Sequence, residues 1–148
     1  MLKTASIFLL IGLLFGALYA AVMIVSPQTI GESTLEARAQ LKLKDVQDPG
    51  AAETILVQTR HMGVFAAAIT IAMFYVLYVG FKKGQAWAWW AFLLVGTLVW
   101  GYGLVIQALE GDVLNLIGHL IGIVLLYLGL LLPINVFFPK KPAAAAKS

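Results

Sequence analysis

The chain contains no cysteine and few charged residues. Because cysteine is absent from all 148 residues, disulfide bonds, thiolate metal sites and thiol nucleophiles are excluded together. Charged residues make up only 11% of the chain, whereas a soluble domain carries about 25%. The ten basic residues are spread along the whole sequence, so the pI near 9.3 does not indicate a nucleic-acid partner. These shortages exclude an ordinary water-soluble globule.

Apolar residues make up 61% of the chain and raise its mean hydropathy to +0.94. A helix that crosses the hydrocarbon core of a bilayer needs about 20 consecutive, predominantly apolar residues. Four stretches of this kind lie at residues 4–25, 62–81, 86–109 and 113–138. The sequence therefore predicts an all-α fold, an integral membrane four-helix up-down bundle that forms one transmembrane domain over residues 1–148.

The first stretch has a competing interpretation as a secretory signal peptide. Lys3 precedes it, and residues 17–21 are rich in small side chains. However, the apolar run is longer than the core of about 7–15 residues in a signal peptide, and Leu18 or Tyr19 would make a poor −3 position. We therefore expect an uncleaved first helix.

Basic residues mark one side of the predicted membrane protein. With a cytoplasmic N-terminus, the cytoplasmic segments hold six lysines and no acid, whereas all seven acids lie on the other side. An excess of lysine and arginine in short loops identifies the cytoplasmic side. We therefore predict a multi-pass protein of the cell membrane whose N- and C-termini are cytoplasmic, with an extracytoplasmic loop at 26–59 and a cytoplasmic tail at 139–148. The six lysines are Lys3, Lys82, Lys83, Lys140, Lys141 and Lys147.

The extracytoplasmic loop is predicted to contain a short amphipathic helix from Leu35 to Val46. Its apolar residues recur on one narrow stripe at about 100° per residue, with Arg38 and Lys42 beside the stripe. Such a helix suits the membrane interface, where long cationic side chains reach the lipid phosphates. A plain solvated connector is the alternative interpretation.

Helix boundaries are marked at four places in the sequence. Asp48 and Pro49 have the pattern of an N-cap followed by the first helical residue, so the second helix is predicted to begin there, beyond the membrane. Residues 82–84 and 110–112 are too short for anything but tight turns between helices. Pro133 is expected to kink the fourth helix.

Small residues provide sites where neighbouring helices can approach closely. In lipid, helices associate through backbone contact at small side chains rather than through apolar burial. The first and fourth stretches each contain a pair of glycines four residues apart, and such pairs support packing within one chain or between subunits. These helix-packing residues are Gly12, Gly16, Gly118 and Gly122.

Aromatic residues directly follow the predicted turn at residues 82–84. Indole rings prefer the headgroup layer of a membrane, so Trp87, Trp89 and Trp90 are predicted to form an interfacial belt. A stacking platform for a flat ligand is the alternative. Trp100 and Tyr102, further along the same stretch, are expected to serve a belt or to pack inward.

Polar residues gather at the predicted outer ends of the spans. Ionisable groups inside spans usually face the bundle interior or a wet cavity, so these residues suggest an outward-facing polar vestibule between the second and fourth helices. Arg60 is expected to pair with Glu110 or Asp112. Simple polarity at span ends that meet water is the alternative. The vestibule residues are Arg60, His61, Gln107, Glu110, Asp112, Asn115 and His119.

The middle of each span carries no Asp, Glu, Lys or Arg. A proton- or ion-coupled transporter normally needs an ionisable group near the bilayer centre. His61 and His119 lack the spacing that pre-forms a metal site on one helix face, and no nucleotide-binding or nucleophile motif is present. We therefore predict no catalytic residue, no metal and no cofactor.

Two segments resemble small bacterial four-helix membrane proteins of the DoxX-like group. They are residues 60–63, which open the second span, and residues 82–90, which join the second span to the third. The resemblance covers about residues 60–138 and implies a four-helix inner-membrane protein. Most members of this kind are uncharacterised, so the resemblance implies no catalytic residue here.

Three functions remain open from the sequence. The leading hypothesis is a non-enzymatic accessory subunit or lipid-associated protein, with membrane lipids, a second copy of the chain or a larger membrane complex as partners, because the spans are charge-free and no catalytic set is present. The alternative is binding or conversion of a hydrophobic small molecule, such as a lipid, quinone or isoprenoid, in the outer vestibule. A small transporter is third.

The predicted orientation can be tested with single cysteines, because the chain has none of its own. We expect Glu36→Cys to react with a membrane-impermeant thiol reagent in intact cells, since positive loops mark the cytoplasmic side. Lys83→Cys should react only after permeabilisation. Labelling of position 83 but not of position 36 in intact cells would reverse the orientation.

Overall fold

The computed structural model describes residues 1–139, and this part of the chain contains helices but no strand. Three long helices are α1 (Leu2–Val25), α3 (Pro49–Val79) and α6 (Val113–Leu131). The fourth consists of α4 (Ala86–Gly96), a π-helical turn η3 (Thr97–Gly101) and α5 (Tyr102–Glu110). All four are long and apolar enough to cross a membrane, which confirms the four apolar helices and indicates a multi-pass membrane protein. Of the predicted tail at 139–148, residues 140–148 lie outside the described part.

Two tight turns connect the long helices as predicted. A 3₁₀ turn, η2 (Phe81–Lys83), and Gly84 lead from α3 into α4, and Gly111 leads from α5 into α6. Gly84 and Gly111 have φ angles of 70° and 73°, in the left-handed region that glycine adopts without a steric penalty. Each pair of joined helices therefore turns back on itself within a few residues.

The loop between α1 and α3 contains a helix, but not over Leu35–Val46. Helix α2 (Pro27–Ala39) begins one residue after α1, with proline at its first position, where the missing N–H costs nothing. It ends at Gln40, whose φ of 54° is left-handed, and a 3₁₀ turn η1 (Leu43–Asp45) follows. The predicted apolar stripe is therefore split between α2 and the segment after it. The prediction was wrong because proline at position 27 starts a new helix directly after α1.

The remaining boundary predictions have mixed outcomes. Asp48 does cap α3, since its carboxylate accepts a hydrogen bond from the Gly50 N–H at 2.8 Å, and α3 begins at Pro49. In contrast, the fourth span does not continue to residue 138. Helix α6 ends at Leu131, and a short helix α7 (Ile134–Phe137) follows Pro133, which has no N–H to continue the ladder.

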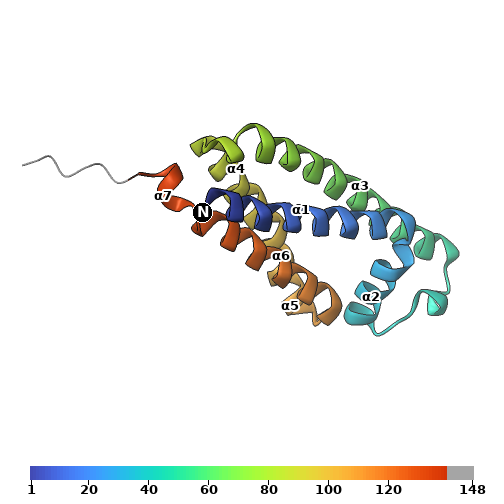
Figure 1. Cartoon of the computed structure of the whole chain (residues 1–148). Coiled ribbons are helices and arrows are strands. Elements are labelled where there is room, and N and C mark those ends of the chain that lie inside the picture. Colours follow the sequence, from blue (N-terminus) through green and yellow to red (C-terminus); the bar gives the residue numbers. More distant parts are fainter. Residues whose placement is uncertain (140–148) are drawn as a thin grey trace, which may run out of the picture.

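The apolar core lies at the end of the molecule that holds the N-terminus, α4 and α7 (Figure 1). Trp89 belongs to this core, since its side chain is buried and its Nε1–H donates to the Leu130 carbonyl at 3.0 Å. Trp89 therefore does not belong to the predicted interfacial belt, whereas Trp87 and Trp90 are each 49% exposed. The buried cluster contains Ala5, Leu9, Met73, Leu77, Phe81, Ala88, Trp89, Phe92, Leu126, Leu130 and Phe137.

The long helices separate toward the opposite end. Helix α1 packs against α3 on one side and α6 on the other, and α3 also contacts α4. Figure 1 shows α3 and α5 diverging from the core end toward α2, and the two helices make no extensive contact with each other. Helix α2 contacts both α3 and α6 at the open end, so it bridges the separated helices. This end of the molecule is called the α2 end below.

Close helix contacts depend on glycines that were only partly predicted. A Cβ at Gly122 would overlap the indole ring of Trp100, and a Cβ at Gly103 would overlap the imidazole of His119. By contrast, a Cβ at Gly118 would have Phe15 as its nearest neighbour at 3.9 Å. Gly12 and Gly16 likewise leave ordinary contact distance, with nearest atoms at 3.6 and 3.4 Å. Of the four predicted packing glycines, Gly122 is therefore the one that excludes a side chain.

Two substitutions on the same helix test this difference. Gly122→Ala should lower the free energy of unfolding by about 1–3 kcal/mol, because the indole of Trp100 must move to make room. Gly118→Ala should leave stability unchanged or raise it slightly, since alanine favours the helix by up to about 1 kcal/mol. The measurement is SDS titration in mixed micelles followed by circular dichroism. Equal effects of the two variants would contradict the assigned contact.

Candidate functional site

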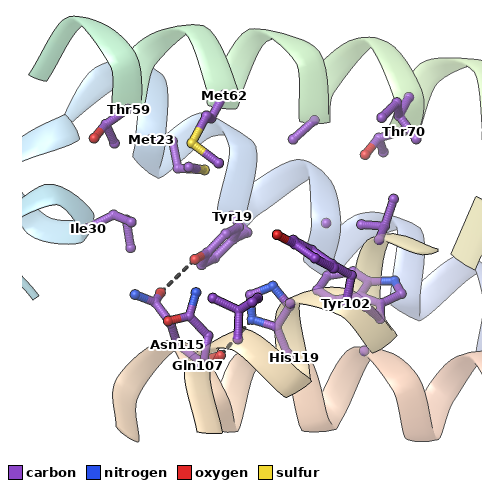
Figure 2. Close-up of a pocket in the computed structure, with 18 of the residues that line it drawn as sticks. Tyr19, Met23, Ile30, Thr59, Met62, Thr70, Tyr102, Gln107, Asn115 and His119 are labelled. Carbon is purple, nitrogen blue, oxygen red and sulfur yellow. Dashed lines mark hydrogen bonds between the residues drawn. The ribbon is translucent and has the colours of Figure 1, made fainter. Parts of the chain in front are cut away.

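A cavity of about 700 Å³ occupies the space between the separated helices (Figure 2). Helices α1, α3, α4, α5 and α6 and the π turn η3 form its walls, and α2 lies at one end. Binding sites for small molecules usually measure about 300–1,000 Å³, so the cavity has room for one such molecule.

The lining changes from apolar to polar along the cavity. The end nearest the core is lined by apolar side chains, including Leu9, Met73, Phe92 and Leu126. The α2 end carries nearly all the hydrogen-bonding and charged groups, and Thr70 lies between the two ends. The polar lining residues at the α2 end are Tyr19, Thr34, Arg38, Thr54, Gln58, Thr59, Tyr102, Gln107, Asn115 and His119.

The cavity opens sideways between α3 and α5. Met62 on α3 and Tyr102 on α5 both line the cavity, yet their side chains are 62% and 68% exposed. Lining residues on α1, such as Met23, are buried by comparison. Figure 2 shows Met62 and Tyr102 on opposite sides of the space, on the ribbons of α3 and α5. The opening therefore lies on the flank of the molecule, between two helices that are each apolar enough to span a membrane.

A buried carboxylate anchors the polar end. Asp112 is 2% exposed and caps α6, where it accepts from the backbone N–H of Asn115 at 3.2 Å and from its Nδ2 at 2.7 Å. The hydroxyls of Ser33 and Thr34 on α2 donate to the same carboxylate at 3.0 and 3.4 Å. A buried charge is tolerated only when it is hydrogen-bonded in this way. Asp112 thereby joins α2 to the start of α6.

Asn115 extends this network across the cavity. Its side chain is buried, and its Oδ1 accepts a hydrogen bond from the hydroxyl of Tyr19 on α1 at 2.5 Å (Figure 2). Its backbone carbonyl lies 2.7 Å from Nδ1 of His119. Because a carbonyl only accepts, Nδ1 carries the proton, and Nε2 of the neutral ring is left as an acceptor. Helices α1, α2 and α6 therefore meet in one chain of hydrogen bonds.

Aromatic rings hold His119 in the wall of the cavity. Its imidazole lies edge-to-face against Trp100 and Tyr19, with ring centroids 5.7 and 6.1 Å away. Trp100 lies in the π turn and stacks on Phe15, with centroids 5.9 Å apart. On its other side, the imidazole packs directly on Gly103 of α5. Single π turns within α-helices are often found at functional sites, and this one carries a ring of the cavity wall.

One ion pair closes the rim at the α2 end. Nη2 of Arg38 on α2 lies 2.6 Å from Oε1 of Glu110 at the end of α5. The expected partner of Glu110 was Arg60, and this prediction is wrong, because Arg60 is exposed on α3 and does not line the cavity. Arg38 forms the pair because α2 folds back toward the α5–α6 turn.

The predicted vestibule residues therefore divide into three groups. Gln107, Asn115 and His119 line the cavity, and Asp112 and Glu110 support its polar end. Arg60 and His61 are exposed outside it.

Several residues of the site were missed in the sequence. Tyr19 was considered only as a possible cleavage-site residue, although a phenol inside an apolar span needs a polar partner. Arg38 was assigned to an interfacial helix, and Ser33 and Thr34 were not singled out. No local pattern links these residues of α2 to Glu110 or Asp112, which lie more than 70 positions away in the sequence.

Two acceptor atoms near this end are buried without a partner in the described residues: Oε1 of Gln107 and Oε2 of Glu110. Within residues 1–139, no three His, Cys, Asp or Glu side chains gather where they could hold a metal ion. The arrangement can therefore hydrogen-bond a polar group at one end and enclose an apolar body at the other.

No protein-family model, curated protein or solved structure matches this chain.

The role of Asp112 can be tested against a second capping aspartate. Asp112→Ala should lower the free energy of unfolding by about 2–4 kcal/mol, because it removes a helix cap and leaves buried donors unpaired. Asp48→Ala, at the exposed cap of α3, should cost only about 1 kcal/mol. The free energies come from SDS titration of both variants, and a loss no greater for Asp112 than for Asp48 would argue against the buried network.

Proposed function

We propose that this protein binds one small amphipathic molecule within the membrane, which enters from the lipid between α3 and α5. The observation that carries the proposal is a cavity with an apolar end, a polar end and an opening on the flank of membrane-spanning helices. A molecule dissolved in the lipid reaches such an opening without crossing water. Its apolar body fills space between the side chains of the cavity wall and makes van der Waals contacts with them. Its polar group finds hydrogen-bond partners at the α2 end.

The proposed orientation is an up-down four-helix bundle with α2 on the extracytoplasmic side and both termini in the cytoplasm. Lys82 and Lys83 lie at the α4 end, where Nζ of Lys82 is 3.7 Å from the ring centre of Tyr78. Half-exposed Trp87 and Trp90 lie at the same end, as expected of residues in the headgroup layer. Helix α3 has 31 residues, about 46 Å at 1.5 Å per residue, so it extends beyond a hydrocarbon core of about 30 Å.

Binding is favoured over chemical conversion because Asp112, Glu110 and His119 at the α2 end are already hydrogen-bonded or ion-paired. Asp112 accepts four hydrogen bonds, and Glu110 pairs with Arg38. Nδ1 of His119 is engaged by its own helix, and within residues 1–139 no side chain makes a hydrogen bond to its Nε2. We therefore propose a non-enzymatic role for the site.

The other hypotheses stay predictions. A role as an accessory subunit, with a second copy or a larger complex as partner, is compatible with the apolar outer faces but has no specific observation in its favour. The same holds for a small transporter and for the resemblance to the DoxX-like group.

Two substitutions on α3 test the binding proposal. Ala66 lines the cavity, whereas Ala68 is exposed and does not. Ala66→Phe should fill part of the cavity and reduce the amount of co-purifying small molecule roughly fivefold or more, because a packed interior has no room for both. Ala68→Phe should retain it at the wild-type level. The measurement is native mass spectrometry in mild detergent, with solvent extraction to quantify the released molecule.

His119→Ala should also release the molecule, while Arg60→Ala should not, because only His119 lines the cavity. Equal retention by wild type, Ala66→Phe and His119→Ala would contradict the binding proposal. Circular dichroism of each variant shows whether it has kept its helices.

A further inference from the structure

We propose that the polar group of the bound molecule is an uncharged hydroxyl rather than a carboxylate, a phosphate or an ammonium group. This inference rests on the proposed function and specifies the chemistry that the cavity recognises. The preferred occupant is therefore a neutral lipid alcohol, with its hydroxyl at the α2 end and its hydrocarbon body toward the core.

The distribution of side chains fixes which end takes the head group. The end nearest the core is lined by Leu9, Phe92 and Leu126, where an unpaired polar group would cost several kcal/mol. At the other end, Gln107 and His119 lie beside the Tyr19–Asn115 hydrogen bond (Figure 2). An amphipathic molecule can satisfy both ends only in one orientation.

The charges at the α2 end disfavour an anionic head. One cation, Arg38, lies on the rim and pairs with Glu110, and a second carboxylate, Asp112, accepts a hydrogen bond from Thr34, four residues before Arg38 on α2. Arg38 is already paired with Glu110 at 2.6 Å, so it is not available to an incoming anion unless that pair breaks. A carboxylate or phosphate would therefore enter a site whose fixed charges sum to −1. Like charges disfavour such an approach.

An ammonium head would meet no carboxylate among the described residues that line the cavity. Asp112 accepts hydrogen bonds from Ser33, Thr34 and Asn115, which occupy its oxygens, and it is buried behind them. Burying a cation without a partner is costly, and Glu110 does not line the cavity: its Oε1 pairs with Arg38 and its Oε2 is buried. The charge arrangement therefore favours a neutral head.

The unused hydrogen-bonding groups match a hydroxyl, which both donates and accepts. Because Nδ1 of His119 donates to the Asn115 carbonyl, Nε2 remains an acceptor without a partner in the described residues. Gln107 lines the cavity (Figure 2): Oε1 of its carboxamide is buried without a partner, and its Nε2 donates no hydrogen bond within the described residues, so Nε2 is the free donor. A hydroxyl at this position can donate to the imidazole and accept from the amide. A ketone or ester could do only the second.

Three photoreactive probes test the inference directly. They share one alkyl chain, with a diazirine in the middle and a terminal alkyne, and differ only in the head: an alcohol, a carboxylate or a trimethylammonium group. The full-length protein in mild detergent is irradiated with each probe, and labelled peptides are identified by mass spectrometry. We expect the alcohol to label cavity residues at least fivefold more than either charged probe. A stronger signal from the carboxylate or the ammonium probe would overturn the inference.

Matched variants show whether the named groups select the head. Gln107→Leu and His119→Phe should each lower cavity labelling by the alcohol at least threefold, because each removes one partner of the hydroxyl. His61→Phe, on the exposed surface of α3, should leave labelling unchanged. Equal labelling by all four proteins would overturn the inference. Gln107→Leu keeps the size of the side chain, so it is informative even if His119→Phe fails to fold.

Removal of one carboxylate should change the preference of the site. In Glu110→Gln, Arg38 loses its ionic partner and becomes free to bind an anion, so labelling by the carboxylate probe should rise at least threefold. Glu53→Gln, on the exposed start of α3, should leave that signal unchanged. No rise in Glu110→Gln would overturn the charge argument.

The probes also separate this inference from the proposal on which it rests. If all three probes label the cavity equally and Ala66→Phe abolishes that labelling, the head-group inference is overturned while the binding function stands. If no probe labels the cavity in the wild-type protein, the binding function itself is overturned.

Discussion

The arrangement of the α2 end depends on the buried carboxylate of Asp112. It caps α6, accepts hydrogen bonds from hydroxyl groups of α2 and holds the side chain of Asn115. Asn115 in turn accepts a hydrogen bond from the hydroxyl of Tyr19 on α1. Helices α1, α2 and α6 are thus positioned by one set of hydrogen bonds. In surroundings of low polarity, this network strongly favours one arrangement of the three helices, because each donor or acceptor left unpaired would cost about 1–3 kcal/mol. These hydrogen bonds hold the helices in place at the end where they lie apart.

The molecule combines a packed end with an open one, and the difference follows from the residues at the helix contacts. At the core end, Gly80, Gly96 and Gly129 let backbones approach closely against Ala88, Leu126 and Leu9. At the α2 end, the rings of Tyr19, Trp100 and His119 pack on one another in the cavity wall, and α3 and α5 make no extensive contact. Since lipid gives apolar helices little reason to close a gap, a cavity can persist beside those rings. The polar network and the cavity therefore occur together.

Much of the site chemistry was predictable, but its connections were not. Gln107, Asn115 and His119 were identified because polar residues in apolar spans usually face a cavity. The choice of Arg60 as the partner of Glu110 was wrong, because α2 begins directly after α1 and brings Arg38 to the rim instead. Trp89 was assigned to the interface by its neighbours in sequence, yet its indole N–H donates to a carbonyl of α6 inside the core.

Hydropathy and charge along the chain were enough to define four helices that are long and apolar enough to cross a membrane, the tight turns at Gly84 and Gly111, and the start of α3 at Pro49. These features are local, since each depends on residues within about one helix length. Which polar groups meet was decided only when the helices crossed. Tyr19 and Asn115 are 96 positions apart, and Ser33 and Asp112 are 79 apart. Their contacts depend on helix tilt and on the path of α2, and periodicity in a sequence specifies neither.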